Sequence, residues 1–327
     1  MKALLLTGAY GFIGTNLSNA LKDNNTLWAL DIAENPNTAY SRYFSWKELD
    51  SIPFDDIDAV IHLAGKAHDT KNQSEAQSYF DINTELTKKV FDKFLNSQAK
   101  RFIFFSSVKA AADTVEGDYL TEDVVPKPVG PYGESKIAAE EYIQVQGARY
   151  RVQGEEGKKI YILRPCMIHG PWNKGNLNLL YGVVKKGIPY PLGAFENKRS
   201  FTAIDNLTFI IEQLLEKNIP SGIYNIADDE TLSTNELIRL MARVMNKPAL
   251  IWNLSPKLIS WLAKIGTLIH LPLNAERLQK LTENYVVSNE KIKKALHIEK
   301  MPVSAMEGFT KTIKSFGHAN RNATYRV

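Results

Sequence analysis

Three glycines near the start of the chain, Gly8, Gly11 and Gly14, lie between an apolar run and a helical pattern. The apolar run at residues 3–7 predicts a buried strand, and the pattern over residues 13–23 predicts a helix. Glycines at this spacing allow a tight turn and a close approach of a pyrophosphate, whose charge then faces the free N–H groups of the helix. A merely flexible turn is the alternative, but the flanking strand and helix favour a dinucleotide-binding βαβ unit.

Asp31 ends the next predicted strand, residues 26–31, about 20 residues beyond the glycines. A carboxylate at this point accepts hydrogen bonds from the ribose hydroxyls of adenosine, and it repels the 2′-phosphate of NADP. The alternative is a solvated aspartate at the end of a strand. The sequence therefore favours NAD as the cofactor.

The order of the predicted elements indicates the fold class. Strands and helices alternate in the first half of the chain, which is the pattern of a parallel sheet covered by helices on both faces. Further strands are expected at residues 59–64, 101–106 and 160–163, and helices at residues 78–97 and 133–146. We therefore expect an α/β fold, a Rossmann-type doubly wound parallel sheet.

Beyond Pro165 glycine and proline become frequent, and helical patterns at residues 205–217 and 234–245 dominate. This part predicts a smaller, mixed α/β substrate lobe at the C-terminal side of the Rossmann domain. The expected boundaries are an NAD-binding domain at 1–165 with returning segments near 203–228, an interleaved substrate-binding lobe at 166–315, and a tail at 316–327.

Composition limits the remaining classes. Of the 327 residues, 44% are hydrophobic and 23% are charged, which is typical of a globular protein. The net charge is +4 and no block of five like charges occurs, so the charge balance does not indicate nucleic acid or an anionic membrane. The most apolar later stretch, residues 258–273, is interrupted by Lys264 and Pro272 and is too short to span a bilayer. We therefore expect a cytoplasmic protein with no membrane insertion and no nucleic-acid partner.

Cysteine and histidine indicate no metal site. Cys166 is the single cysteine, which excludes an intramolecular disulfide, and it is interpreted as a small buried side chain. The six histidines are scattered without metal-ligand spacing, so no metal is expected. His62 lies inside an apolar strand and is interpreted as a packed core histidine, whereas His68 follows a cofactor-facing loop and is a candidate for reaching substrate.

A second group of residues indicates catalysis. Tyr132 and Lys136 form a Y-x-x-x-K pattern at the start of a predicted helix, which places both on one helix face. A phenol has a pKa of about 10, but a neighbouring ammonium and a positive nicotinamide ring lower it and allow general-base action. Ser107 ends a buried strand and can hydrogen-bond the same substrate oxygen. A surface tyrosine and lysine are the alternative, which their position in a nucleotide-binding sheet disfavours.

The segments TGAYGFIG, IHLAG, FIFFSS, YGESK, LRPCMIHGP and RSFTAIDN, together with Asp31, occur in the order of a known family. The chain resembles the extended short-chain dehydrogenase/reductase family, in its nucleotide-sugar epimerase/dehydratase branch, over essentially residues 1–230. The resemblance implies NAD as the cofactor and Ser107, Tyr132 and Lys136 as the catalytic set. It implies cofactor contacts from Gly8, Gly11, Phe12, Ile13, Gly14, Asp31, Leu63, Ala64, Gly65, Tyr132, Lys136, Pro165 and Ile168.

The resemblance also implies residues that bind a sugar linked to a nucleotide diphosphate. Asn176 and Leu177 would contact the diphosphate, and Arg199 would pair with its phosphates, since a guanidinium is permanently charged and donates bidentately. A surface ion pair is the alternative for Arg199. Arg277 is a second candidate for a phosphate partner.

Lys109 departs from the family pattern. It stands two residues after Ser107, where the 4,6-dehydratases carry a carboxylate that acts in elimination, so dehydratase chemistry loses its acid/base group. The SSVK segment resembles the subgroup of quinovosamine-type 4-ketosugar reductases and their epimerase relatives. Ser107 and Lys109 are therefore candidates for binding the substrate.

The expected activity is that of an NAD-dependent 4-epimerase of a UDP-hexose or UDP-N-acetylhexosamine, acting through a 4-keto intermediate. The alternative is an NAD(P)H-dependent 4-ketosugar reductase of the UDP-quinovosamine type, since the same three catalytic residues serve both reactions. A dinucleotide-binding sensor without turnover is a further alternative, and the complete Ser107, Tyr132 and Lys136 set argues against it.

The resemblance further implies a homodimer. Relatives pair the helices near residues 78–97 and 133–146 of two subunits as a four-helix bundle, which would partly bury Phe80 and Tyr142 between the subunits. The alternative is that these side chains face only the sheet of their own subunit.

Overall fold

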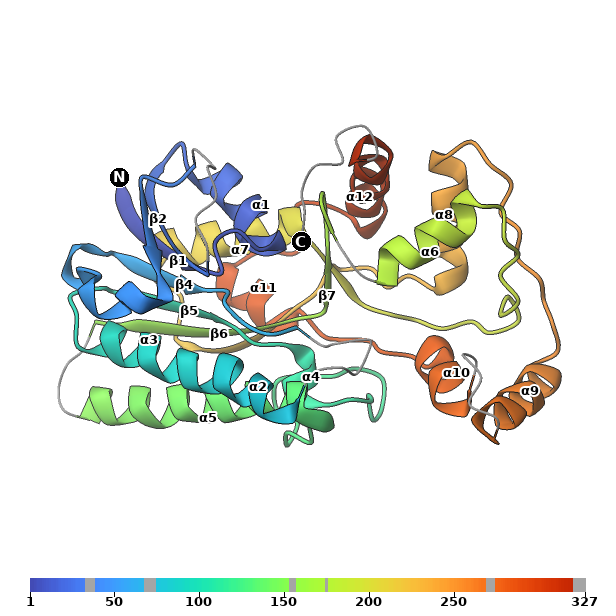
Figure 1. Cartoon of the computed structure of the whole chain (residues 1–327), viewed down its shortest axis with the longest axis horizontal. Helices are drawn as coiled ribbons and strands as arrows, with labels where there is room; N and C mark the ends of the chain where they lie inside the picture. The colour runs from blue at the N-terminus through green and yellow to red at the C-terminus, as the bar shows by residue number, and fades with distance from the viewer. Residues whose placement is uncertain (33–38, 68–74, 153–156, 174–175, 269–273, 320–327) are drawn as a thin grey trace.

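The computed structural model describes residues 1–32, 39–67, 75–152, 157–173, 176–268 and 274–319. Within them, seven parallel strands form one sheet in the order β3-β2-β1-β4-β5-β6-β9, which confirms the predicted Rossmann-type α/β fold (Figure 1). The strands are β1 (Lys2–Thr7), β2 (Asn25–Asp31), β3 (Arg42–Ser45), β4 (Ala59–His62), β5 (Arg101–Phe105), β6 (Lys159–Pro165) and β9 (Gly222–Ile226). The order reverses at β1 and β4, and this fold binds ligands at the carboxyl ends of the strands beside that reversal.

Helices cover both faces of the sheet because consecutive strand residues point to opposite faces. Leu4 and Leu6 of β1 pack with α1, α7 and α11, whereas Leu5 packs with α3 and α5, and Figure 1 shows these two helix layers on either side of the sheet. All three leucines are fully buried, which explains why β1 is apolar throughout and does not alternate. The helices are α1 (Phe12–Leu21), α2 (Ala76–Phe80), α3 (Leu86–Leu95), α5 (Gly130–Val152), α7 (Ile204–Glu216) and α11 (Glu290–Leu296).

The C-terminal lobe follows directly from the carboxyl end of β6 and extends away from the sheet (Figure 1). Its elements are β7 (Met167–His169), β8 (Phe201–Ala203), α6 (Asn176–Lys185), α8 (Thr234–Val244), α9 (Pro256–Leu268), α10 (Ala275–Thr282) and α12 (Ala305–Ala319). Side chains of α6, α8 and α12 share one core, and α9 and α10 share a smaller one. None of the helices in the described part of the chain has the length and apolar character that a membrane crossing requires.

Two predicted element ends differ from the structure. Helix α12 continues past residue 316, where a tail was expected, because Phe309, Ile313 and Phe316 form an apolar stripe that packs in the lobe core. Residues 320–327 of that predicted tail lie outside the described residues. Strand β6 continues past residue 163, where its end was expected, through Arg164 to Pro165. Proline is tolerated at this last position because it has no N–H group to donate and the strand ends there.

The helix expected over residues 78–97 is interrupted. Helix α2 ends at Phe80, Asp81–Glu85 form a π-helical turn, and α3 begins at Leu86. The turn buries two polar side chains, Asn83 and Thr84, which an uninterrupted helix would place differently. Such turns are rare and frequently occur at functional sites, and this one lies against α5.

Candidate active site

The glycine-rich turn is fixed at the carboxyl end of β1. Gly8 has a φ of +64°, which is costly for any side chain, and a Cβ there would lie 2.9 Å from the backbone of Ala64. A Cβ on Gly14 would lie 2.4 Å from the carbonyl oxygen of Ala9, so only glycine lets α1 approach the strand this closely. The tight turn that the sequence predicted therefore requires glycine at Gly8, and the packing of α1 requires it at Gly14.

The start of α1 fits an anionic group. Its N-cap residue, Gly11, offers no side-chain cap, and the first turn contains no acidic residue, so the free N–H groups of the helix are available. Phe12 and Ile13 are half-buried at this turn, and Ile13 packs against the core of the sheet. A dinucleotide pyrophosphate suits this cradle because it is negative and needs close backbone approach.

Asp31 lies at the end of β2, beside the glycine-rich turn. Its carboxylate accepts hydrogen bonds from the backbone N–H of Tyr10 at 2.8 Å and of Ile32 at 2.7 Å. Tyr40, which the sequence analysis did not single out, donates its hydroxyl to the carbonyl oxygens of Ala9 at 2.9 Å and Gly14 at 3.3 Å. Asp31 and Tyr40 thus fix the turn from two sides.

The three predicted catalytic residues lie together. Ser107 follows β5 and caps the short helix α4 (Val108–Ala111), while Tyr132 and Lys136 lie one turn apart at the start of α5. The Ser107 hydroxyl lies close enough to the Tyr132 phenol to lower its pKa, and the Lys136 ammonium donates to the carbonyl oxygen of Phe105 at 2.8 Å. The structure therefore brings a phenol, a hydroxyl and an ammonium to the carboxyl edge of the sheet.

Burial controls the ionisation of this group. It raises the pKa of Tyr132, although the hydrogen bond from Ser107 opposes that shift. Burial lowers the pKa of Lys136 to about 8, and the Glu140 carboxylate opposes the change. A phenolate at Tyr132 therefore requires further positive charge in the site, which an oxidised nicotinamide ring supplies when it is bound.

The loop after β4 reaches the same site. A Cβ on Gly65 would lie 2.9 Å from the ammonium of Lys136 and 3.0 Å from the side-chain oxygen of Asn83, so glycine lets these groups meet. Asn83 binds both polar atoms of the Lys66 backbone and donates to the hydroxyl of Ser135 at 3.0 Å. The π-helical turn thereby holds the loop against α5, a role that the sequence analysis missed.

The structure confirms that His62 is a packed core residue. It is fully buried, and its two ring nitrogens lie 2.7 Å from the Thr7 hydroxyl and 2.9 Å from the Thr87 hydroxyl. Thr87 donates its own proton to the carbonyl oxygen of Asn83, so His62 donates to Thr87 from Nε2 and accepts from Thr7 at Nδ1. The backbone N–H of Ala64 completes the chain by donating to Thr7. This network holds a neutral histidine between the end of β1 and α3, next to the glycine-rich turn.

The network predicts a pH dependence of stability. Burial lowers the pKa of His62 to about 3 in the folded protein, against about 6.5 when it is unfolded. The contribution of neutral His62 is therefore complete above pH 6.5 and is lost as the pH falls toward 3. Between pH 7 and pH 5 we expect His62 to account for about 2 kcal/mol of lost unfolding free energy. The unfolding free energy measured with urea should therefore change less between pH 7 and pH 5 in His62→Gln than in the wild type, by this amount. An equal change in both proteins would contradict the role assigned to neutral His62.

A buried ion pair lies next to the three predicted catalytic residues. Arg164 of β6 donates to both carboxylate oxygens of Glu140 from Nε, at 3.0 and 3.1 Å, and from a terminal nitrogen at 2.6 Å. Ser106 also donates its hydroxyl to Glu140. Glu140 lies one turn after Lys136, and Ser106 precedes Ser107, so the pair joins the segments that carry the catalytic set.

A cationic rim lies beside this group. The Lys109 ammonium lies 4.6 Å from the ring centroid of Tyr285 and 2.9 Å from the Asp113 carboxylate. Arg199 pairs through its backbone with Tyr285, and its side chain donates to the carbonyl oxygen of Lys280 at 2.9 Å. Cys166 is buried in the cluster that contains Tyr285, and its burial raises the pKa of the thiol. Lys109 and Arg199 are thus neighbours of one aromatic ring, Tyr285, which the sequence analysis did not identify.

The other predicted site residues have different surroundings. Leu63 is half-buried after β4, Pro165 ends β6, and Ile168 of β7 packs partly against the sheet core. The Leu177 side chain is buried in the lobe core, so any contact with a diphosphate would come from its backbone in the first turn of α6. His68 and the side chains of Asn176 and Arg277 lie outside the described residues. Among the residues that are described, no group of three or more His, Cys, Asp or Glu could hold a metal ion.

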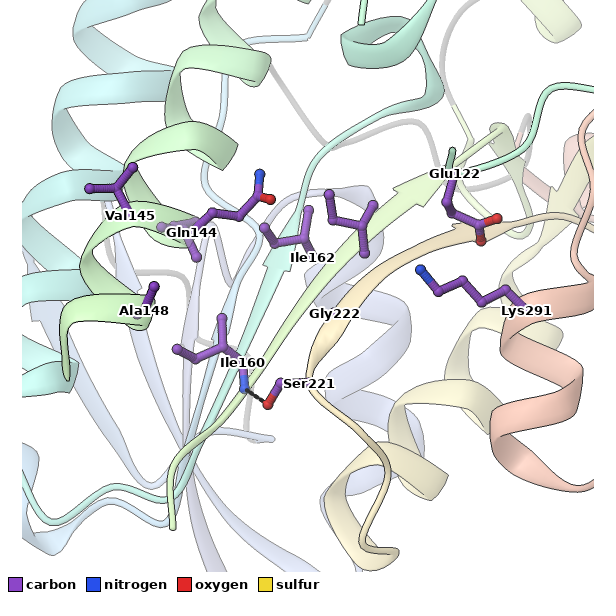
Figure 2. A pocket seen from close by; sticks show the side chains of 12 residues that line it. Glu122, Gln144, Val145, Ala148, Ile160, Ile162, Ser221, Gly222 and Lys291 are labelled. Carbon is purple, nitrogen blue, oxygen red and sulfur yellow. Dashed lines mark hydrogen bonds between the residues drawn. The ribbon is translucent and has the colours of Figure 1, made fainter. Parts of the chain in front are cut away.

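A separate cavity of about 580 Å³ lies between α5 and the strands β6 and β9 (Figure 2). Apolar side chains of Ile160, Ile162 and Ile223 line it, and Glu122 and Lys291 lie at its edge. It includes neither a residue of the glycine-rich turn nor a residue of the catalytic set. The cavity therefore does not coincide with the residues that the sequence predicts to bind cofactor and substrate.

Comparison with known proteins agrees with the geometry. Residues 4–227 match the NAD dependent epimerase/dehydratase family. UDP-glucose 4-epimerase of Vibrio cholerae is 30% identical over 98% of this chain and 97% of its own length. N-acetyl-alpha-D-glucosaminyl-diphospho-ditrans,octacis-undecaprenol 4-epimerase of Escherichia coli O157:H7 is 28% identical over 75% of this chain and 72% of its own length.

The fold has solved counterparts as well. UDP-glucuronic acid 4-epimerase from Bacillus cereus, solved in complex with NAD, superposes with a TM-score of 0.73 at 21% identity. The superposition covers 97% of this chain and 99% of that structure, so both lobes share its architecture. With the family match spanning both the glycine-rich turn and the Tyr132 and Lys136 pair, the chain belongs to the NAD-dependent epimerase/dehydratase family of extended short-chain dehydrogenase/reductase enzymes, and its cofactor is NAD.

Proposed function

We propose that this protein is a nucleotide-sugar 4-epimerase that acts on a UDP-hexose or a UDP-N-acetylhexosamine through a 4-keto intermediate. The observation that carries the proposal is that the Ser107 hydroxyl lies beside the Tyr132 phenol and lowers its pKa, with Lys136 one helical turn away, beside the glycine cradle. The similarity to a UDP-glucose 4-epimerase over almost the whole chain supports the choice of substrate class.

Each catalytic residue has a defined task in this proposal. Tyr132 takes the proton of the sugar C4 hydroxyl, and Ser107 hydrogen-bonds the same oxygen. A nicotinamide cofactor, when bound, would supply the acceptor and the donor of the C4 hydride. Lys136 holds the cofactor ribose and adds positive charge that favours the phenolate of Tyr132. Tyr132 then returns its proton to the C4 oxygen, and the configuration inverts when the ketone has presented its other face.

The remaining residues bind the two ligands. Asp31 accepts the adenosine ribose hydroxyls, and Arg199 pairs with the substrate phosphates. The proposed cofactor contacts also include Gly8, Gly11, Phe12, Ile13, Gly14, Leu63, Ala64, Gly65, Pro165 and Ile168. Lys109, Asn176, Leu177 and Arg277 remain proposed substrate contacts.

A 4-ketosugar reductase is the second candidate, because Lys109 occupies the position of the dehydratase carboxylate. Its ammonium is engaged by the carboxylate and the carbonyl oxygen of Asp113, so Asp113 is not a free acid for elimination. Ketone reduction needs no such acid, since Tyr132 supplies the proton. This observation argues against a dehydratase, and it does not distinguish the 4-epimerase from the 4-ketosugar reductase.

One experiment distinguishes the candidates. The purified protein is incubated with UDP-glucose or UDP-N-acetylglucosamine and NAD, and products are identified by NMR, with Tyr132→Phe as the inactive control. An epimerase forms the galacto isomer without net reduction of NAD. A reductase forms nothing in this assay but consumes NADH with a UDP-4-keto-6-deoxy sugar. Binding of NAD without turnover in either assay would indicate a non-catalytic sensor.

The role of Asp31 predicts the cofactor preference. Asp31→Asn removes the carboxylate that repels a 2′-phosphate, so NADP binding should strengthen relative to NAD binding. Fluorescence titration with both cofactors measures this ratio in the wild type and the variant. A wild-type protein that already binds NADP more tightly would contradict the assigned role.

We also propose a homodimer through α2, α3 and α5. Phe80 and Tyr142 are half-buried on these helices, and the Tyr142 hydroxyl donates to the Asp92 carboxylate across the α5 and α3 pair. Light scattering at micromolar concentration should give twice the chain mass, and Phe80→Arg should give the single mass. A monomeric wild type over this concentration range would disprove the dimer.

A further inference from the structure

The outward face of α9 carries a stripe of apolar side chains. Leu258, Trp261 and Leu262 are 46%, 59% and 41% exposed, and Ile265 is half-buried. Their positions follow the i, i+3, i+4, i+7 spacing that normally directs one helix face into a core. Here that face is directed outward, so the helix exposes the kind of surface that helices usually bury.

A different face of α9 holds the helix to the protein. Ile259 and Ala263 are 2% and 0% exposed and pack with Leu192 and Leu278 of the small core. At about 100° per residue, these two side chains point roughly a third of a turn away from the stripe. The fold of the lobe therefore accounts for Ile259 and Ala263 and leaves the stripe unexplained.

The charges on α9 itself have one sign. Lys257 and Lys264 are exposed on α9, and the helix contains no acidic residue. The sequence from residue 237 to residue 275 contains five lysines and arginines and no aspartate or glutamate. The balance of the whole chain conceals this local excess, which is why composition alone did not indicate an anionic partner.

The position of α9 leaves it accessible. Figure 1 shows it at the outer end of the C-terminal lobe, away from the sheet and from α5, where the catalytic tyrosine and lysine lie. A second exposed tryptophan, Trp252, precedes the helix and is 55% exposed. Tryptophan is the side chain that prefers the boundary between lipid headgroups and acyl chains, because its ring is apolar and its N–H is polar.

We propose that α9 docks the C-terminal lobe on an anionic lipid surface. Leu258, Trp261 and Leu262 would enter the headgroup and acyl boundary, while Lys257 and Lys264 would extend to lipid phosphates. The helix lies in the interface and spans nothing, as its length requires. This inference does not depend on the sugar that the active site accepts.

Vesicle sedimentation tests the proposal with the full chain. Vesicles of phosphatidylcholine mixed with phosphatidylglycerol should bind the protein, and vesicles of phosphatidylcholine alone should bind it much less. Trp261→Ser should weaken binding at least about tenfold through lost apolar burial. Lys257→Gln and Lys264→Gln should each weaken vesicle binding about fivefold, and added salt should also weaken it.

Matched substitutions make the test specific. Trp172 is 55% exposed and Met306 is 41% exposed on other elements, so Trp172→Asn and Met306→Ser are controls for Trp261→Ser and Leu262→Ser. The controls should bind vesicles like the wild type, and all variants should keep its melting temperature. Equal losses in the controls, or absent binding to anionic vesicles, would overturn the proposal. If the wild type does not bind vesicles and Trp261→Ser halves the mass measured in solution, then a second copy of the chain covers the stripe instead.

Discussion

Tyr132→Phe is expected to lower the rate of hydride transfer by about 10²–10⁴-fold, the usual contribution of one general acid/base. The substitution removes the phenol that Ser107 hydrogen-bonds and leaves the aromatic ring. That ring lies 6.4 Å from the ring of Tyr79 in an edge-to-face arrangement, and phenylalanine can keep this contact. Loss of rate should therefore reflect chemistry and not packing. Single-turnover absorbance of the reduced nicotinamide measures it.

Binding measurements separate this role from a structural one. NAD affinity should remain near the wild-type value in Tyr132→Phe, because the glycine-rich turn is untouched. Lys136→Met should lower the rate as well and should also weaken NAD binding, since it removes the ammonium assigned to the ribose. Near-normal hydride transfer in Tyr132→Phe would show that the proton leaves by another route, with Lys109 the next described side chain to test.

The sequence predicted those site features whose cause is local. Gly8 has a positive φ and Gly14 lies against the carbonyl oxygen of Ala9 in the same turn, so their spacing is visible without the rest of the fold, whereas the contact of Gly8 with Ala64 is not. Tyr132 and Lys136 lie on one helix face because they are four residues apart. The apolar runs of the strands predicted the parallel sheet, since a sheet buried on both faces leaves no polar alternation. Local rules therefore sufficed to place the glycine-rich turn and to put Tyr132 and Lys136 on one helix face.

Features that depend on distant partners were not predictable in this way. Tyr40 and Tyr285 lie in irregular segments, and their contacts with the glycine turn and with Lys109 appear only in the folded chain. The π-helical turn around Asn83 has no marker in an otherwise helical pattern. Glu140 and Glu141 are adjacent and chemically alike, yet Glu140 is fully buried and Glu141 is exposed. Glu140 faces Arg164 of β6 and Ser106 beyond β5, and these partners are visible only in the folded chain.

The buried pair of Glu140 and Arg164 gives the second prediction. Both side chains are almost completely buried, at 0% and 2% exposure, so neither charge has access to solvent. Glu140→Gln leaves the guanidinium buried without its counter-charge, which typically costs about 3–5 kcal/mol of unfolding free energy. Arg164→Met should cost a similar amount because it isolates the carboxylate. Urea unfolding of both variants measures these losses.

A double substitution tests whether the loss belongs to the pair. Glu140→Met with Arg164→Met removes both charges, and its stability should exceed that of Glu140→Met alone or Arg164→Met alone, since buried pairs are often replaceable by apolar side chains. Additive losses in the double variant would instead show two independent packing effects.

The pair should also influence the catalytic group through Lys136. The Glu140 carboxylate raises the pKa of Lys136 against the effect of burial, which by itself lowers it. In Glu140→Gln the pKa of Lys136 should therefore be lower than the wild-type value of about 8. NAD binding should weaken as rising pH removes the proton of Lys136, and in the variant this weakening should occur at a lower pH than in the wild type. Glu141→Gln, the exposed neighbour, is the matched control and should leave both the pH profile and the stability unchanged. A Glu140→Gln variant that loses stability but keeps the wild-type pH profile would restrict the pair to the fold, because a purely structural contact has no reason to move the titration of Lys136.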